Sequence, residues 1–321
     1  MAKPRRLGVV MDPIAQIHFA KDTTLALLLA AQARGFELSY LEQADLSLRD
    51  GRAFGRMRPL TVRADPASWF TLGEPRLEPL GTLECLLMRK DPPFDMEYVY
   101  TTYILERAQE EGALIVNRPQ GLRDMNEKVY TAWFPQCCAP TLVTRDRSDM
   151  QAFLREHGKI VCKPLHGMGG RSIFVVERND KNANVIFETL SDYGRQFAIV
   201  QRYIPDIADT GDSRVLLIDG EPVPYALARM PQGDDHRGNL AAGARGIGRP
   251  LNERDRWLAG EIGPSLAARG MLLVGLDVIG GYVTEINVTS PTGIRELDQQ
   301  FHIDIGGMLI EAIERRLARP A

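Results

Sequence analysis

Lys163-Pro164-Leu165-His166-Gly167-Met168-Gly169-Gly170-Arg171-Ser172 is a lysine at the end of an apolar run, followed at once by a glycine-rich turn. The glycines allow the backbone to approach an anion closely and to present N–H groups to it. A second stretch, Glu285-Ile286-Asn287, places two oxygen ligands two residues apart on an expected strand. A phosphate site beside a divalent-cation site predicts ATP chemistry. A Walker loop is excluded, because the chain contains no G-x-x-x-x-G-K-[ST] sequence.

Lysine is scarce in this chain, which gives Lys163 more weight. Only seven of the 39 basic residues are lysine, so arginine supplies most of the positive charge. A lysine ammonium is a compact point charge suited to phosphate oxygens. The alternative is a strand-end lysine that faces solvent beside a tight glycine hairpin.

Asp277, Glu285 and Asn287 are the candidate metal ligands. Residues 285 and 287 face the same side of a strand, and carboxylate and amide oxygens suit Mg²⁺. A two-residue turn at Gly280-Gly281 pairs Asp277 with Thr284, whereas a three-residue loop pairs Asp277 with Glu285. We predict the three-residue loop with a glycine-assisted bulge. The alternative is that Asp277 is a paired structural carboxylate.

Composition limits the class of protein. The 321 residues carry a net charge of −3, which argues against nucleic-acid binding. No run approaches the roughly 18 apolar residues of a membrane span. The four cysteines lack metal spacing, and no secretory signal is recognisable. We therefore expect free thiols in a cytoplasmic protein that contacts neither nucleic acid nor membrane.

The first part of the chain predicts a parallel α/β layer. Strands are expected at 6–12, 37–43, 83–90 and 114–117, with helices at 23–34 and 98–111. Ligands of such a layer bind at the carboxyl ends of the strands. We therefore expect ligand contacts near Asp12 and Arg89-Lys90-Asp91.

The rest of the chain predicts two α+β units, with boundaries that give domains 1–121, 122–204 and 205–321. The second unit is expected to hold helices at 126–133 and 149–157 and strands at 140–144, 159–164, 172–177 and 198–203. The third is expected to hold strands at 213–219 and 222–229, helices at 252–268 and 305–316, and the hairpin 271–288. Residues 230–250 lack apolar periodicity, and loops of such length are typically lids. The arginines in and around this loop favour a flexible segment, 230–245, that closes over a labile intermediate.

Several motifs resemble bacterial glutathione synthetase, a family with the ATP-grasp fold, in which two α+β subdomains clamp ATP. The matching segments are Met11-Asp12-Pro13-Ile14, Met88-Arg89-Lys90-Asp91-Pro92-Pro93-Phe94-Asp95, Asn126-Glu127-Lys128, Lys163-Pro164-Leu165, Gly238-Asn239-Leu240-Ala241-Ala242-Gly243 and Thr284-Glu285-Ile286-Asn287-Val288-Thr289-Ser290-Pro291. The resemblance implies ATP-driven ligation of γ-glutamylcysteine to glycine through an acyl phosphate. It also implies Mg²⁺, with Mn²⁺ as a substitute, and a homo-oligomer, commonly a tetramer.

The resemblance assigns roles residue by residue. Lys128 and Lys163 contact the ATP phosphates, and residues 166–170, with Gly167, Gly169 and Gly170, form the small phosphate loop. Gln201, Tyr203 and Ile204 hold adenine, and Asp212 holds the ribose side. Glu285 and Asn287 bind the metal, with Asp277 as the third ligand. The candidates for substrate and transition-state charge are Arg214, Arg229 and Arg295, and Asn239 with the 230–245 loop covers the acyl phosphate. The family has an acidic residue where His166 stands, which puts a role for that side chain in doubt.

Three alternatives remain at this point. The chain is a different ATP-grasp carboxylate–amine ligase, a nucleotide-binding module without catalysis, or a kinase that stops at phosphoryl transfer. The Arg89–Asp95 run argues against a different ligase, and the intact metal ligands argue against an inactive module.

Overall fold

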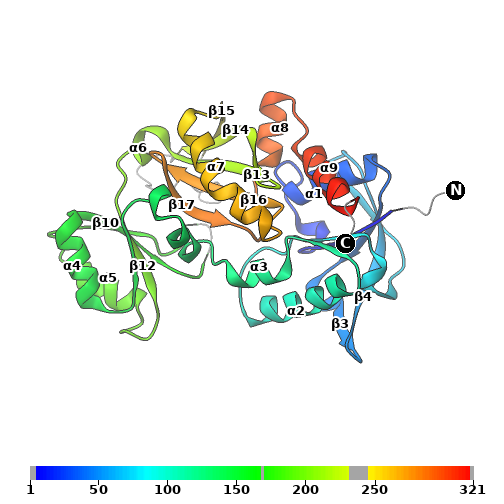
Figure 1. Cartoon of the computed structure of the whole chain (residues 1–321), viewed down its shortest axis with the longest axis horizontal. Coiled ribbons are helices and arrows are strands. Elements are labelled where there is room, and N and C mark those ends of the chain that lie inside the picture. The colour runs from blue at the N-terminus through cyan, green and yellow to red at the C-terminus, as the bar shows by residue number, and fades with distance from the viewer. Residues whose placement is uncertain (1–4, 168–169, 231–244, 319–321) are drawn as a thin grey trace.

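A computed structural model describes residues 5–167, 170–230 and 245–318. These residues form three sheets, of eight, four and five strands, which follow one another along the sequence (Figure 1). Each sheet lies within one of the predicted ranges 1–121, 122–204 and 205–321. The division into three domains at those boundaries remains a prediction. No helix in the described ranges is long and apolar enough to cross a membrane.

The N-terminal sheet has the strand order β3-β4-β2-β1-β7-β8, with β5 and β6 paired to β4. Its central strands β2, β1, β7 and β8 are parallel, as predicted. Its strands are β1 (Arg6–Val10), β2 (Glu37–Leu41), β3 (Leu46–Arg49), β4 (Arg52–Val62), β5 (Phe70–Leu72), β6 (Arg76–Pro79), β7 (Cys85–Met88) and β8 (Leu114–Val116). Its helices are α1 (Thr23–Ala33), α2 (Met96–Glu110) and the 3-10 turns η1 (Ile14–Gln16), η2 (Gln43–Asp45) and η3 (Leu80–Thr82).

The middle sheet is antiparallel, with the order β11-β10-β12-β9. It comprises β9 (Thr141–Thr144), β10 (Lys159–Pro164), β11 (Phe174–Glu177) and β12 (Ala198–Arg202). The helices α4 (Arg147–His157) and α5 (Ala183–Leu190) cover one face and form the lobe at the left of Figure 1. This lobe has a hydrophobic core of its own, centred on Met150, Ile160 and Phe187.

The connection into this lobe differs from the prediction. Residues 126–133 were expected to be one helix, but only a 3-10 turn, η4 (Val129–Trp133), forms after α3 (Pro119–Asp124). The Asn126 side chain accepts hydrogen bonds from the backbone N–H groups of Lys128 and Val129, each at 3.0 Å. Such side-chain capping competes with helical hydrogen bonding, which accounts for the difference. The turn η5 (Pro135–Cys137) follows.

The C-terminal sheet has the order β15-β14-β13-β16-β17. Its elements are β13 (Asp212–Ile218), β14 (Glu221–Met230), β15 (Arg245–Pro250), β16 (Leu273–Ile279), β17 (Tyr282–Asn287), α6 (Ile207–Thr210), α7 (Glu253–Ala268), α8 (Ile294–Phe301) and α9 (Ile305–Leu317). The prediction of irregular structure over 230–250 is wrong at both ends. Met230 is the last residue of β14, residues 245–250 form β15, and Met230 pairs with Arg245. The predicted loop itself lies outside the described residues, at 231–244.

The β16–β17 hairpin confirms the predicted pairing of Asp277 with Glu285, but its turn differs from the predicted one. Asp277 does lie opposite Glu285, but the turn is the two-residue Gly280-Gly281, since Ile279 pairs with Tyr282. Both glycines have positive φ angles, 54° and 77°, as this tight turn requires. The register shifts between Asp277 and Val278. A bulge in β17 therefore supplies the extra residue that we expected in the loop.

Asn117 joins the N-terminal and C-terminal sheets. Its amide nitrogen donates to Leu273 O and Val288 O, both at 2.7 Å, and its oxygen accepts from Leu272 N at 2.7 Å and Leu273 N at 3.0 Å. The side chain is buried. One hydrophobic core continues from strands of the first sheet to β16 and β17, so these two parts of the chain pack as one body.

Replacing Asn117 with alanine is expected to destabilise the protein by about 3 kcal/mol or more, because four buried backbone groups lose their partner. Chemical denaturation of the wild type and the variant measures this loss. Asn184→Ala is the matched control, since Asn184 is exposed and its side-chain oxygen accepts one surface hydrogen bond. An equal effect of the two substitutions would show that Asn117 does not join the sheets energetically.

Candidate active site

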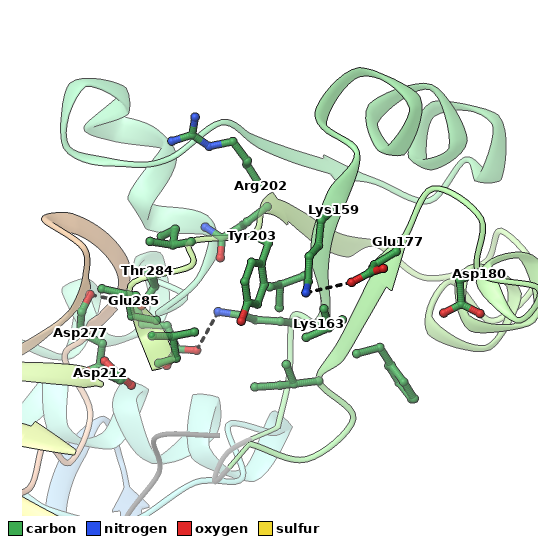
Figure 2. Close-up of a pocket in the computed structure, with 18 of the residues that line it drawn as sticks. Lys159, Lys163, Glu177, Asp180, Arg202, Tyr203, Asp212, Asp277, Thr284 and Glu285 are labelled. Carbon is green, nitrogen blue, oxygen red and sulfur yellow. Dashed lines mark hydrogen bonds and ion pairs between the residues drawn. The ribbon is translucent and has the colours of Figure 1, made fainter. Parts of the chain in front are cut away.

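A cavity of about 1020 Å³ lies where the middle sheet meets the C-terminal sheet (Figure 2). One wall is the open face of β10, whose alternate residues Lys159, Val161 and Lys163 point into the cavity. The opposite wall is the β16–β17 hairpin. The remaining lining residues are Ile173, Phe174, Val175, Glu177, Asn179, Asp180, Gln201, Arg202, Tyr203, Ile204, Ile207, Asp212, Asp277, Ile279, Thr284 and Glu285.

Lys163 lies in the wall of this cavity rather than in solvent. Only 8% of its surface is exposed, and its ammonium nitrogen lies 3.8 Å from Glu285 Oε1. The alternative of a solvent-facing strand-end lysine is therefore wrong. Figure 2 shows the two side chains pointing toward each other across the cavity.

Lys128 reaches the same carboxylate from a different segment. Its ammonium lies 4.0 Å from Glu285 Oε1, 2.5 Å from Glu127 Oε1 and 3.2 Å from Gly167 O. The backbone explains this approach, because Ile286 N of β17 donates to Glu127 O at 2.8 Å. The two predicted phosphate lysines are thus brought together around Glu285.

The charge of Lys128 is maintained in spite of its burial. Burial alone would lower the pKa of Lys128, but the carboxylates of Glu285 and Glu127 outweigh it, so the pKa is raised. Because Lys163 and Lys128 each lie near Glu285, its carboxylate offsets their mutual repulsion. The result is a fixed pair of positive charges around Glu285, and Lys163 of this pair lines the cavity.

Asp277 is held by two buried arginines. Its Oδ1 accepts from Arg214 Nε at 2.6 Å, and its Oδ2 lies 3.1 Å from Arg214 Nη2 and 2.9 Å from Arg229 Nη2. Arg229 also contacts Asp212 Oδ2 at 2.5 Å. Gly275 makes room for this network, since a Cβ there would lie 2.7 Å from Arg214 Cδ. Asp277 is therefore a paired carboxylate, as the alternative interpretation expects, and it also lines the cavity.

The two aspartates of this network differ in their acidity. Burial would raise the pKa of Asp277, but Arg214 and Arg229 outweigh it and hold the pKa below its usual range. For Asp212, burial dominates over the attraction of Arg229 and, together with the nearby charge of Asp277, raises the pKa to about 6. Its Oδ1 is buried without a hydrogen-bond partner. Asp277 therefore supplies permanent negative charge beside Glu285.

The residues on this side of the cavity fit a hard divalent cation. The register places Asp277 opposite Glu285, and Asn287 follows two residues along the same face of β17. The described ranges contain no group of three or more His, Cys, Asp or Glu that could hold a metal. A cation here must therefore also use the amide oxygen of Asn287 or substrate oxygens, which suits Mg²⁺.

The residues predicted to hold adenine and ribose, Gln201, Tyr203, Ile204 and Asp212, all line the cavity. Asp212 lies near Asp277, since both contact Arg229. Sequence reasoning missed Lys159, whose ammonium lies 4.3 Å from the centre of the Tyr203 ring and 2.9 Å from Glu177 Oε1. The alternation of 159, 161 and 163 on one strand was the available signal.

Other predicted residues lie elsewhere. Arg295 is outside the cavity, with its guanidinium 5.1 Å from the centre of the Phe19 ring. Arg214 and Arg229 lie behind Asp277 rather than in the lining. The backbone at Gly167 and Gly170 is described, whereas Gly169 and Asn239 lie outside the described residues.

The predicted ligand region at the carboxyl ends of β1 and β7 contains a set of paired side chains. Lys90 Nζ lies 2.8 Å from Asp12 Oδ1, and Asp91 N donates to Asp12 Oδ2 at 2.9 Å. Arg89 is buried and donates to Pro291 O at 3.1 Å, which links this edge to the segment after β17. The contact between Arg89 and Pro291 joins the motif that contains Arg89-Lys90-Asp91 to the motif that ends at Pro291.

A cavity between two α+β units, with buried lysines on one side and an acidic strand on the other, is the arrangement of an ATP-grasp protein. Solved structures support this class. The D-cycloserine synthetase DcsG has a TM-score of 0.69 at 17% identity and covers 97% of this chain and 99% of its own. The ATP-grasp ligase PsnB, complexed with minimal precursor, Mg and ADP, has a TM-score of 0.62 at 15% identity and covers 98% of both chains. At such identities the likeness concerns the fold alone.

The chain belongs to the prokaryotic glutathione synthetase family. The N-terminal domain model of that family matches residues 6–123, and its ATP-grasp domain model matches residues 127–302. A glutathione synthetase from Pseudomonas putida is 58% identical over 97% of this chain and 98% of its own length. Another, from Xanthomonas axonopodis pv. citri, is 60% identical over 97% and 98%.

Lys163→Ala is expected to lower ATP turnover on the order of a hundredfold or more, because a fixed charge at the predicted phosphate site is lost. Steady-state phosphate release measures the effect. Lys181→Ala is the control, since Lys181 is exposed and is not among the residues that line the cavity. Thermal unfolding should be similar in both variants, and near-normal turnover in Lys163→Ala would refute the assigned role.

Proposed function

We infer that the chain is an ATP-dependent ligase that joins γ-glutamylcysteine to glycine and forms glutathione, ADP and phosphate. Family membership over nearly the whole chain supports this function. The observation that carries it is the convergence of Lys128 and Lys163 on Glu285, which lines one large cavity together with Lys163. Such a site can hold a triphosphate and a cation together.

The chemistry requires an activated carboxylate. The cysteinyl carboxylate oxygen attacks the γ-phosphorus of ATP and ADP leaves, which produces an acyl phosphate. The glycine amine then attacks the acyl carbon, loses a proton and displaces phosphate. Catalysis rests on placement and charge stabilisation, which Lys128 and Lys163 supply by holding the phosphates beside Glu285. Arg214 and Arg229 hold Asp277 in place for the same site.

The remaining site assignments are part of this proposal. Asp277, Glu285 and Asn287 would hold Mg²⁺, or Mn²⁺ in its place, and the charge of the cation would screen that of the phosphates. Gln201, Tyr203 and Ile204 hold adenine, and Asp212 holds the ribose. Arg295 and Asn239 remain candidates for substrate contact.

We also propose a cytoplasmic homo-oligomer. All four cysteines are free thiols, and three are buried, which fits a reducing compartment. The tetramer rests on the family resemblance alone. Light scattering of the purified protein measures the number of subunits.

Phosphate release is the direct test of the function. It should require γ-glutamylcysteine and glycine together and should equal the glutathione formed. Formation of ADP with γ-glutamylcysteine alone, with the phosphoryl group kept on the substrate, would indicate a kinase. Phosphate release with another carboxylate in preference would indicate a different ligase. No release with any substrate, despite nucleotide binding, would indicate an inactive module.

Asn287→Ala is expected to raise the Mg²⁺ concentration for half-maximal turnover by at least about tenfold, because the cation loses an oxygen ligand. Titration of Mg²⁺ at saturating ATP measures this. Mg²⁺-dependent binding of ADP, followed by calorimetry, should weaken in parallel. An unchanged Mg²⁺ requirement in both measurements would remove Asn287 from the metal site.

A further inference from the structure

Asn126 lies at a junction of three segments. Its side-chain oxygen caps the turn at Lys128 and Val129, and its amide nitrogen donates to Leu165 O at 3.1 Å. Leu165 directly follows β10 and begins the glycine-rich turn. One side chain therefore orders the turn that carries Lys128 and also holds the place where the phosphate loop begins.

The neighbouring contacts repeat this arrangement. Lys128 Nζ donates to Gly167 O, so residues 126 and 128 hold the carbonyls of residues 165 and 167. Between them, Glu127 O accepts a hydrogen bond from Ile286 N of β17, the strand that carries Glu285. The segment 126–128 thus connects the glycine-rich turn to β17.

We propose that Asn126 is a positioning residue, which sets the distance from the start of the glycine-rich turn to Lys128 and Glu285. It acts through Leu165 and touches no reacting group. The proposal rests on the assignment of this end of the cavity to nucleotide phosphates. A triphosphate bridges the two sides, and a displacement of about 1 Å at such a site can cost on the order of a hundredfold.

The competing explanation is that Asn126 only caps the turn. Substitutions separate the two roles because different atoms perform them. The side-chain oxygen caps the turn, and the side-chain nitrogen contacts Leu165 O. Serine and aspartate keep an acceptor at the capping position, but neither reaches Leu165 O as a donor. Alanine loses both contacts.

The test compares Asn126→Ser, Asn126→Asp and Asn126→Ala in the full-length protein, with Asn182→Ser as the control. Asn182 is exposed and begins α5 without a side-chain cap. Calorimetry measures binding of adenosine, ADP and a non-hydrolysable ATP analogue, each with Mg²⁺. Thermal unfolding measures stability, and steady-state kinetics give KM and kcat.

All three variants at position 126 should bind the ATP analogue roughly tenfold more weakly and bind adenosine as the wild type does. Their KM for ATP should rise while the KM for γ-glutamylcysteine stays within about twofold. Only the alanine variant should lose stability. The control should match the wild type throughout.

Three results would overturn the proposal. Wild-type analogue affinity in the serine and aspartate variants would leave only the capping role. A defect confined to the aspartate variant would point to the added charge. Equal losses for adenosine and the ATP analogue would place the effect outside the phosphate end. Nucleotide binding is measured without the other substrates, so a failed ligase assignment is distinguishable from a failed role of Asn126.

Discussion

The bulge in the β16–β17 hairpin is the constraint on which the site depends. Side chains alternate between the faces of a strand, so a shift of one residue moves the whole set to the other face. The two-residue turn alone would pair Asp277 with Thr284 and would turn Glu285 away. The bulge restores the pairing of Asp277 with Glu285. The bulge therefore decides whether Glu285 of β17 faces Lys128 and Lys163.

The charges of the site are fixed before any ligand enters. Two unit charges about 4 Å apart attract by about 4 kcal/mol at an effective dielectric constant of 20, so Glu285 holds both Lys128 and Lys163 strongly. Asp277 is held in turn by two arginines. Each group is thus oriented by an opposite charge. A phosphate bound as proposed would meet ammonium groups already in place, and little reorganisation would remain.

Sequence reasoning succeeded where periodicity was strong and failed where long-range contacts decide the structure. The apolar strands around Lys163 and the parallel strands of the first sheet were predicted, whereas the polar alternation of β4 and the helices α5 and α8 were not. The predicted pairing of Asp277 with Glu285 is confirmed, but the predicted three-residue loop is wrong. The extra residue lies in a bulge of β17 instead of in the loop. The capping by Asn126 and the arginine partners of Asp277 come from segments that no local pattern connects.

The packing of the core gives the two lysines different parts in the site. Lys163 belongs to the lobe with its own core. The segment that carries Lys128 is tied to β17 of the C-terminal sheet by the hydrogen bond from Ile286 N to Glu127 O. The contacts of Asn126 with Leu165 and of Lys128 with Gly167 join this segment to the glycine-rich turn that follows β10 of the lobe. Together with the hydrogen bond from Ile286 N to Glu127 O, they connect the glycine-rich turn to β17 through residues 126–128.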